Sequence, residues 1–492
     1  MNNIPFISII ISMIGAIILI LLGKKANTAL SVLKGILVVV GALSLLLIFY
    51  FINNGGTITY MLGHFPSPWG NELRFGLFES LLAFVFATVL LLAIAGGEKD
   101  IVEDIQSRKR SKYFALLSLL LLSLLALIYT NDIFTSYVFI EINTVASCGI
   151  VMAKESGETL RATIKYLFMS LMASGLFLIS IALLYSITGQ LLIPALNDAI
   201  ANLVSSGDYR WPLFLAATLM TISLGVKSAL FPFHTWLPDA HGTATTSSSS
   251  ILSGVVVKGY IILLIKIYYR VFGIEVIKGI GILNVLFVLG IAGMIFGSIF
   301  AIKEGNIKRM IAYSSVAQIG YIYAGIGLGN EAGLAAALFH MIVHAYTKPL
   351  LFSSAGGLIA VSKHSKNIKD LTGAARRNRL AGIGFVIGSL SMVGVPLFGG
   401  FASKLFLAQS ASEHGYALLI ALAISSFLNA LYYLPVVFRI YGKDEEALQS
   451  EDKVEISLGY KLSIGCFTII NFVLGIGGMY VLYLLNQGVQ LL

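Results

Sequence analysis

The chain has 492 residues, of which 57% are hydrophobic and only 12% are charged, and its mean hydropathy is +0.89. This composition excludes an ordinary water-soluble domain, because apolar runs of about 20 residues, the length that crosses a ~30 Å hydrocarbon core, recur from one end to the other. The two cysteines, Cys148 and Cys466, lie inside apolar runs and offer neither a disulfide framework nor the CxxC spacing of a metal site. The sequence therefore predicts an all-α polytopic membrane protein that binds no cofactor of its own.

Fourteen segments are predicted to span the membrane. The first begins at Ile4 and lacks both the basic region and the small-residue cleavage site of a signal peptide, so we expect it to remain as a span. Helix-breaking residues interrupt the seventh and the twelfth segments. The predicted spans are residues 4–23, 29–51, 75–96, 113–129, 132–153, 163–187, 212–243, 245–269, 279–301, 307–328, 331–360, 380–412, 416–440 and 462–486.

Lysine and arginine are distributed unevenly among the loops. They are frequent after odd-numbered spans, whereas the loops after even-numbered spans contain only Arg74, Arg210, Arg270 and Lys278. Because basic residues accumulate on the cytoplasmic side, an even number of spans places both termini on the outer side of a prokaryotic plasma membrane. Loop residues also account for the net charge of +9, so we expect no nucleic-acid binding.

A sparse set of ionisable residues lies inside the predicted spans, where one charge costs roughly 2.5 to 3.5 kcal/mol and usually marks a function. We interpret the set as a candidate ion pathway. Lys266 is close to Arg270 at the end of its span, and we expect it to extend to the membrane interface instead. The other members are Glu141, Lys227, Lys258, His340, His344, Lys348 and Lys404.

Pro232 and Pro238 interrupt the seventh span. Proline lacks a backbone donor and its ring displaces the preceding turn, so carbonyl groups are left for water or polar side chains to satisfy. Lys227 and His234 are seven residues apart, a spacing that places them on one helix face. The serines and threonines of residues 243–250 either supply hydroxyls to a hydrated site or only accompany a proline kink.

His340, His344 and Lys348 follow one another at intervals of four residues in the eleventh span, so they stack along one helix face. Histidine exchanges protons near neutral pH, and lysine does so where burial or a cationic neighbour weakens its hold on the proton. The spacing predicts a ladder of exchangeable protons. Two histidines so spaced also suit a metal site, although no carboxylate or thiol lies nearby in the sequence.

Four motifs occur in the chain in the order VKSALFPFHTWLPDAHGTATTSSSSILSGVVVKGY, KRMIAYSSVAQIGY, LFHMIVHAYTKPLLF and GVPLFGGFASKLFL. Across nearly the whole chain the sequence resembles the antiporter-like subunits shared by respiratory complex I, membrane-bound hydrogenases and Mrp-type cation/proton antiporters. The resemblance implies fourteen helices, with spans four to eight and nine to thirteen forming inverted repeats that each contain one discontinuous helix. The corresponding divisions are residues 1–112, 113–270, 271–441 and 442–492.

The resemblance also implies roles for single residues. Glu141 and Lys227 match an acid–lysine pair of the fifth and seventh spans, in which a nearby carboxylate favours the charged lysine and an open pair favours release of its proton. Lys404 matches a position that is lysine or glutamate among relatives, beyond the predicted break at Gly394 and Pro396. The largest sibling type usually has an acid where this chain has Leu405, so we expect one of the shorter siblings.

The implied function is ion translocation in a multisubunit membrane complex. Moving one charge against 100 mV costs ~2.3 kcal/mol, and the chain has no recognisable nucleotide or cofactor site to supply it. Three hypotheses remain: a proton pump driven by redox partners, an antiporter in which an inward proton drives sodium outward, and a structural subunit that seals a complex. Expected partners are sibling antiporter-like subunits, small membrane subunits, lipids and a peripheral redox arm that holds any iron–sulfur, flavin or nickel centres.

Overall fold

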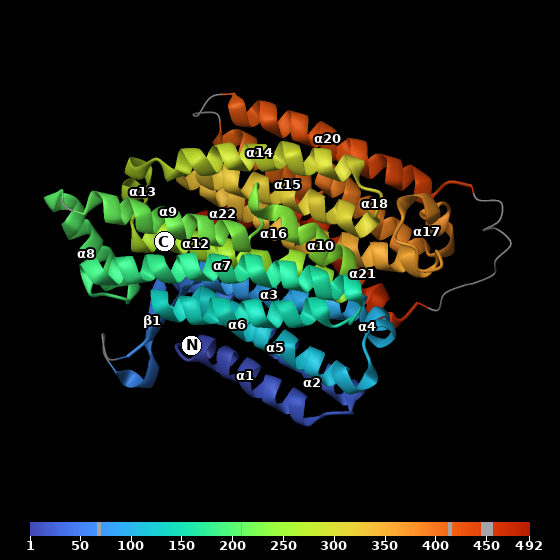
Figure 1. The fold of residues 1–492 in the computed structure, drawn as a ribbon, viewed down its shortest axis with the longest axis horizontal. Coiled ribbons are helices and arrows are strands. Elements are labelled where there is room, and N and C mark those ends of the chain that lie inside the picture. The colour runs from blue at the N-terminus through green and yellow to red at the C-terminus, as the bar shows by residue number, and fades with distance from the viewer. Residues whose placement is uncertain (66–69, 208, 412–415, 444–455) are drawn as a thin grey trace.

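The computed structural model describes residues 1–65, 70–207, 209–411, 416–443 and 456–492. Long helices lie side by side with their axes roughly aligned (Figure 1). Both chain termini lie at one end of this bundle, which we name the termini end, and the opposite end, which carries α4 and α17, is named the basic end. Residue 412, the predicted end of the twelfth span, and part of the predicted segment 442–492 lie outside the described residues.

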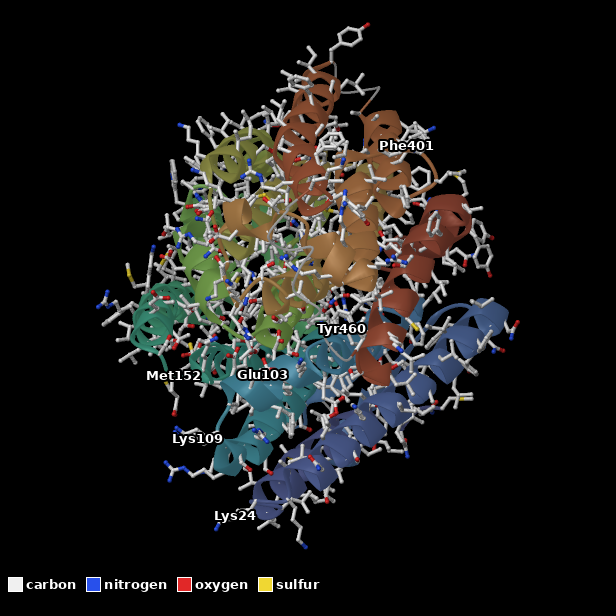
Figure 2. The ribbon with its side chains drawn as sticks, turned by 90° about the vertical axis from the view of Figure 1, so that its right-hand side faces the viewer. Lys24, Glu103, Lys109, Met152, Phe401 and Tyr460 are labelled. Atoms are coloured by element: carbon white, nitrogen blue, oxygen red, sulfur yellow. The ribbon has the colours of Figure 1, made fainter. Side chains whose placement is uncertain are left out.

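The N-terminal region forms one edge of the molecule. Viewed from the basic end, α1 and α2 lie along this edge, and Lys24 and Lys109 project outward nearby (Figure 2). A two-stranded antiparallel hairpin, which an all-α prediction does not include, pairs Thr57 with Gly76 and Met61 with Glu72. Its first strand, TITYM, is rich in residues that favour extended structure. The elements are α1 (Ile4–Leu21), α2 (Ala26–Asn54), β1 (Thr57–Met61), β2 (Glu72–Gly76), α3 (Leu77–Gly96) and α4 (Glu98–Asp104).

The next group of helices includes the first interrupted span. Side chains cap several starts: the carboxylate of Asp132 accepts from the Thr135 amide at α6, and the Ser156 hydroxyl accepts from the Thr159 amide at α7. The elements are α5 (Ser107–Tyr129), α6 (Ile133–Met152), α7 (Gly157–Thr188), α8 (Ile193–Ser206), α9 (Arg210–Lys227), α10 (Trp236–Thr243), α11 (Thr246–Ile251) and α12 (Val257–Lys266).

The remaining helices include the second interrupted span. Within this group α14 and α15 approach closely, because a Cβ atom at Gly290 would lie 2.5 Å from the Ala324 nitrogen and one at Gly320 would lie 2.5 Å from the Gly290 oxygen. The elements are α13 (Ile274–Ile280), α14 (Ile282–Lys303), α15 (Ile307–Gly327), α16 (Glu331–Ala360), α17 (Ala374–Arg377), α18 (Arg379–Val393), α19 (Gly399–Ser410), α20 (Ala417–Ile440), α21 (Leu458–Ile476) and α22 (Gly478–Val489).

Eleven helices among the described residues are long and apolar enough to cross a membrane. The predicted seventh and twelfth spans do not meet this criterion because each is split, into α9 and α10 and into α18 and α19. The predicted tenth span is α15, which has 21 residues but carries charged and hydroxyl side chains. Two spans lie at the centre: the apolar windows of Thr246–Val271 and Glu331–Ala360 are 100% buried.

The prediction of one continuous last span over residues 462–486 is wrong, because the helix is interrupted at Gly477 between α21 and α22. Glycine at 475 explains the interruption in part, since a Cβ atom there would lie 2.0 Å from the Leu397 carbonyl oxygen. The absence of a side chain at Gly475 lets the segment between α18 and α19 approach this part of the last span. The two interruptions therefore lie against each other.

Candidate functional site: a buried polar axis

Six ionisable side chains in the centre of the bundle form what we name the polar axis: Glu141, Lys227, Lys258, His344, His340 and Lys404. At one end, the Lys227 ammonium lies 4.0 Å from Glu141 Oε1 and donates a hydrogen bond of 2.8 Å to Thr144 Oγ1. The lysine side chain is fully buried, whereas the glutamate side chain is 28% exposed. The pair is therefore close but not in full contact, and a small movement of either side chain changes its strength.

Tyr260 of α12 contacts the Lys227 ammonium through its ring. The Lys227 ammonium lies 5.5 Å from the centre of the Tyr260 ring. The Tyr260 hydroxyl donates to Asn143 Oδ1 over 2.9 Å, and the Asn143 amide donates to the Ser123 hydroxyl. Polar contacts thus extend from Lys227 on α9 to Tyr260 on α12, which also carries Lys258, and from Tyr260 to Asn143 on α6 and Ser123 on α5.

Lys258 and His344 form the contact between the two central helices. The Lys258 ammonium lies 2.5 Å from His344 Nδ1, and it also donates to the Ser253 carbonyl. Both side chains are buried, with exposures of 1% or less. An ammonium can donate to a neutral imidazole nitrogen, so this contact has the composition of a proton-exchanging pair.

His340 continues the axis one helical turn from His344. Its Nδ1 lies 2.8 Å from the Ser403 hydroxyl of α19, and its ring stacks on Tyr321 with centroids 5.1 Å apart. The Lys404 ammonium lies 5.2 Å from the centre of the same tyrosine ring. His340 and Lys404 are thus joined through Ser403 and Tyr321.

Lys404 also occupies the end of an interrupted helix. Its ammonium donates to the carbonyls of Met392 and Val393, over 2.8 and 2.9 Å, and to the Ser426 hydroxyl over 3.0 Å. These carbonyls belong to the last turn of α18, which has no further helical turn to bind them. The break in the twelfth span thereby creates the site that holds Lys404.

The break in the twelfth span occupies residues 394–398, and Gly394 and Pro396 both lie in it. Gly394 has φ of +95°, a conformation that favours glycine, and a Cβ atom there would lie 3.0 Å from Lys404 Cδ. The break in the seventh span occupies residues 228–235 and contains Pro232. The prediction that Pro238 also lies in this break is wrong, because Pro238 is in the first turn of α10, where a missing backbone donor leaves no helical bond unmade.

His234 does not lie on one helix face with Lys227. The segment between them is not a regular helix, so the seven-residue spacing does not bring the side chains together. The His234 ring instead stacks on Phe231 and Phe300, with centroid distances of 5.3 and 5.7 Å.

Lys348 also has a different environment from the one predicted. His340, His344 and Lys348 are all buried on α16, but their partners lie on different helices. The Lys348 ammonium donates to the Ser314 hydroxyl over 2.7 Å, and to the Ile311 carbonyl and the Tyr433 hydroxyl over 3.1 and 3.3 Å. Lys348 thus faces α15 and α20, to one side of the polar axis.

The prediction that Lys266 extends to the membrane interface is wrong. Its side chain is fully buried, and its ammonium donates to the carbonyls of Leu127, Ile128 and Thr130 at the end of α5. A cation at a helix C-terminus is favoured by the exposed carbonyls and by the helix dipole. The sequence shows only that Lys266 is close to Arg270. It does not show that the end of α5 lies beside Lys266 in the folded chain.

His241 is a buried residue to which the sequence pattern assigns no role. Its ring stacks on Phe352 with centroids 4.9 Å apart, and among the described residues neither ring nitrogen has a hydrogen-bond partner. The ring is within electrostatic reach of Lys258 and Lys348 in the centre and of Lys308 at the start of α15. The only sequence signal is one more histidine inside the first motif.

A charged cavity of about 60 Å³ opens at the basic end beside Lys308. Asp100 and Lys366 line it from outside the membrane-spanning helices. Burial raises the pKa of the Asp100 carboxyl above its usual value, against the hydrogen bond from Thr246. Burial and the charge of Lys154 lower the pKa of Lys366.

Several buried polar atoms along the axis have no hydrogen-bond partner within the described part of the chain. They include Glu141 Oε1, the Nε2 atoms of His340 and His344, and the Tyr321 hydroxyl. Buried polar atoms are normally satisfied by protein or water, so these atoms identify where water would bind. Nowhere in the described ranges do three His, Cys, Asp or Glu side chains come together as metal ligands.

Comparison with known proteins places this geometry in a family. Residues 130–429 match the family described as NADH:quinone oxidoreductase/Mrp antiporter, transmembrane region. The chain is 34% identical to NADH-quinone oxidoreductase subunit N of Desulforudis audaxviator, over 78% of this chain and 75% of that protein. It is 25% identical to a Na(+)/H(+) antiporter subunit of Bacillus subtilis, over 100% of this chain and 97% of that protein.

Two solved structures have the same fold. A chain of the membrane-bound sulfane sulfur reductase, an archaeal respiratory membrane complex, superposes with a TM-score of 0.89 at 25% identity, covering 99% of this chain and 97% of that one. A chain of the Mrp complex from Dietzia sp. superposes with a TM-score of 0.87 at 23% identity, with the same coverage. The chain is therefore a multi-pass membrane protein that belongs to the NADH:quinone oxidoreductase/Mrp antiporter family of antiporter-like subunits.

Proposed function

We propose that this chain translocates protons along the polar axis as a subunit of a multisubunit membrane redox complex. The observation that carries the proposal is the contact of 2.5 Å between Lys258 and His344, because it joins the two central helices through groups that both exchange protons. Five of the six ionisable groups of the axis are buried, which is costly in a membrane protein, and a function in ion transfer accounts for that cost.

The Glu141–Lys227 pair acts as the switch at one end of the axis. While the carboxylate stays within 4.0 Å, it stabilises the charged ammonium. When the carboxylate moves away, the buried ammonium keeps the Thr144 hydroxyl and the Tyr260 ring as neutral partners, and it passes its proton toward Lys258. Lys258, His344, His340 and Lys404 then carry protons through the second half, while the charge of Lys348 acts on Lys258 from beside the axis.

We further propose the architecture that the family resemblance implies. The chain crosses the membrane fourteen times, and residues 113–270 and 271–441 are inverted repeats between the N-terminal helices of 1–112 and the last span within 442–492. The corresponding breaks, between α9 and α10 and between α18 and α19, support this division. In each half the break lies beside a lysine of the axis, Lys227 or Lys404.

The membrane is the plasma membrane of a prokaryote, with the basic end in the cytoplasm and both termini outside. The excess of lysine and arginine at the basic end supports this orientation. The cavity beside Asp100 and Lys366 then faces the cytoplasm and supplies protons to the axis by way of His241.

Partner subunits supply the energy. The similarity to a subunit of NADH-quinone oxidoreductase and to a chain of a respiratory membrane complex supports redox partners. We propose that iron–sulfur, flavin or nickel centres reside in a peripheral arm and that sibling antiporter-like subunits and small membrane subunits flank this chain. Electron transfer in the arm would alter the Glu141–Lys227 pair through these neighbours.

Sodium/proton antiport is the second candidate function. The Bacillus subtilis antiporter subunit is similar over the full length of this chain, which favours it. The co-purifying subunits distinguish the two: a redox arm supports the pump, and only small membrane subunits support the antiporter. Transport that requires sodium would likewise support the antiporter, and transport that proceeds without sodium would support the pump.

Lys227→Ala tests the proposed function. We expect the variant to assemble but to lose translocation by ~100-fold or more, because a positioned proton-transfer group commonly contributes this much. The measurement is proton uptake by vesicles that contain the reconstituted complex. Lys303→Ala, which removes an exposed lysine outside the axis, is the control and should transport normally. Normal transport by the Lys227 variant would contradict the proposal and would favour a purely structural subunit.

A further inference from the structure

A crevice opens between α9 and α14 at the termini end of the bundle. Its mouth is a hollow of about 470 Å³ lined by the end of α8, the start of α9 and α13. A second, more apolar hollow of about 200 Å³ continues from it, and Ile280 lines both. The volume of the mouth is in the range of pockets that bind small molecules, whereas the deeper hollow is narrower.

The crevice runs parallel to the helices for about half the thickness of a membrane. Phe214, Thr218 and Ile222 line it on α9, and Ile282, Val285 and Leu289 line it on α14. Residues at these spacings form one face of each helix. At 1.5 Å per residue, the stretch from 214 to 222 covers about 12 Å, whereas one leaflet of a ~30 Å hydrocarbon core is ~15 Å deep.

The mouth has the features of a membrane interface. Trp211 and Tyr209 beside it are 79% and 51% exposed, and such aromatic side chains concentrate at the level of lipid headgroups. Glu275 in the mouth is neutralised by Lys278 at 2.7 Å. Arg210 also lines the mouth, and within the described ranges its guanidinium has no ion-pair partner. Among the described residues that line the mouth, the charge that remains is therefore positive.

We propose that this crevice binds one membrane phospholipid, with an acyl chain between α9 and α14 and its phosphate on Arg210. A guanidinium binds a phosphate through two parallel hydrogen bonds, and an apolar slot that opens at headgroup depth suits an acyl chain. Each buried CH₂ group stabilises such binding by ~0.8 kcal/mol. This proposal does not depend on the proposed proton transport.

The lipid would contact the first interrupted span. Leu230 and Phe233 line the deep part of the crevice, and both belong to the segment between α9 and α10. This segment carries no continuous helical ladder, so its position depends on side-chain packing. An acyl chain in the crevice would hold it against α14.

Two variants and two matched controls test the lipid site. Arg210→Gln removes the phosphate ligand, and Val285→Trp fills the slot. Val288→Trp is the control for the second variant, because Val288 and Val285 are exposed valines on α14, with exposures of 62% and 56%, and only Val285 is among the residues lining the crevice. Lys303→Gln, at the other end of α14, is the control for the loss of a cation.

The measurement is the number of phospholipids that the full chain retains after reconstitution into vesicles of phosphatidylethanolamine and phosphatidylglycerol and re-extraction into mild detergent, counted by native mass spectrometry. We expect Val285→Trp and Arg210→Gln to lose one retained lipid and both controls to keep it. Equal lipid numbers in Val285→Trp and the wild type would overturn the proposal. Cross-linking of a cysteine at position 285 to a partner helix in the assembled complex would also overturn it, because a protein would then occupy the crevice.

Discussion

Lys404 combines two roles that most buried lysines do not share. Its ammonium binds the carbonyls of Met392 and Val393 at the end of α18, and it also lies at the end of the polar axis beside Tyr321. Lys266 performs only the first role, because it binds three carbonyls at the end of α5 and has no histidine partner among the described residues. Burial alone therefore does not distinguish a lysine of the polar axis from one that only caps a helix. The groups that contact the ammonium make this distinction.

Substitutions at Lys404 separate proton transfer from helix capping. Lys404→Glu keeps a titratable group, and its protonated form can donate to the Met392 carbonyl, whereas Lys404→Met can do neither. We expect the glutamate variant to keep part of the proton uptake and the methionine variant to fall by ~100-fold, the loss expected for removing a transfer group. The comparison uses reconstituted complexes at matched expression. Transport by the methionine variant at or above the level of the glutamate variant would exclude Lys404 as a relay.

The residue scale also explains why some site predictions fail. A spacing of seven residues would place His234 and Lys227 on one face of a continuous helix. The helix ends at Lys227, so the spacing does not determine where the His234 side chain lies. Lys266 looks peripheral in the sequence because its surroundings come from α5, more than 130 positions earlier in the chain. Contacts such as Lys258 with His344 are likewise between distant segments, so the sequence identifies the residues but not their pairing.

At the scale of elements, the two interruptions are the features on which the site depends. Each is predictable, because proline and glycine inside a long apolar run have a direct effect on the helix. Three other elements are not predictable in this way: the hairpin of β1 and β2, the helix α8, and the division of the last span at Gly477. Short or amphipathic segments between spans carry little hydropathy signal, and the last division depends on close approach to Leu397.

Gly400→Ala tests the packing at the second interruption. A Cβ atom at this position would lie 1.7 Å from the Ser391 carbonyl oxygen, so α19 must move away from α18. We expect a destabilisation of ~1–3 kcal/mol or more, as for overpacked cores, together with loss of assembly or of transport. Thermal unfolding in detergent is the measurement. Gly465→Ala is the control, since nothing lies within 4 Å of its Cβ position, and equal stability of the two variants would contradict this packing.

At the scale of the whole molecule, the two ends of the bundle differ in charge, and both termini lie at the less basic end. The orientation in the membrane would decide the direction of the proposed proton transfer, because the cavity beside Asp100, the proposed entry, is at the basic end. The fold itself is largely predictable from hydropathy and motifs, and the TM-score of 0.89 to a respiratory complex chain agrees with it. Orientation, in contrast, comes only from the loop charges.

Reporter fusions test this orientation. A fluorescent protein that matures only in the cytoplasm should be dark when fused after Leu492, because the loop charges predict a C-terminus on the outer side. The same reporter fused after Lys443, in a loop that follows an odd-numbered span, should be bright. A bright C-terminal fusion would reverse the proposed topology and with it the direction of the proton path.

The central claim, that protons pass through the polar axis, is tested most directly by a matched pair of substitutions on one helix. Lys258 and Lys266 are both buried on α12, and arginine keeps the charge at either position but does not release its proton at neutral pH. The measurement is proton translocation per assembled complex in vesicles that contain Lys258→Arg or Lys266→Arg. We predict a loss of ~100-fold for Lys258→Arg, as for removal of a transfer group, and transport near the wild-type rate for Lys266→Arg, which still caps α5. Equal transport by the two variants would contradict the proposed pathway.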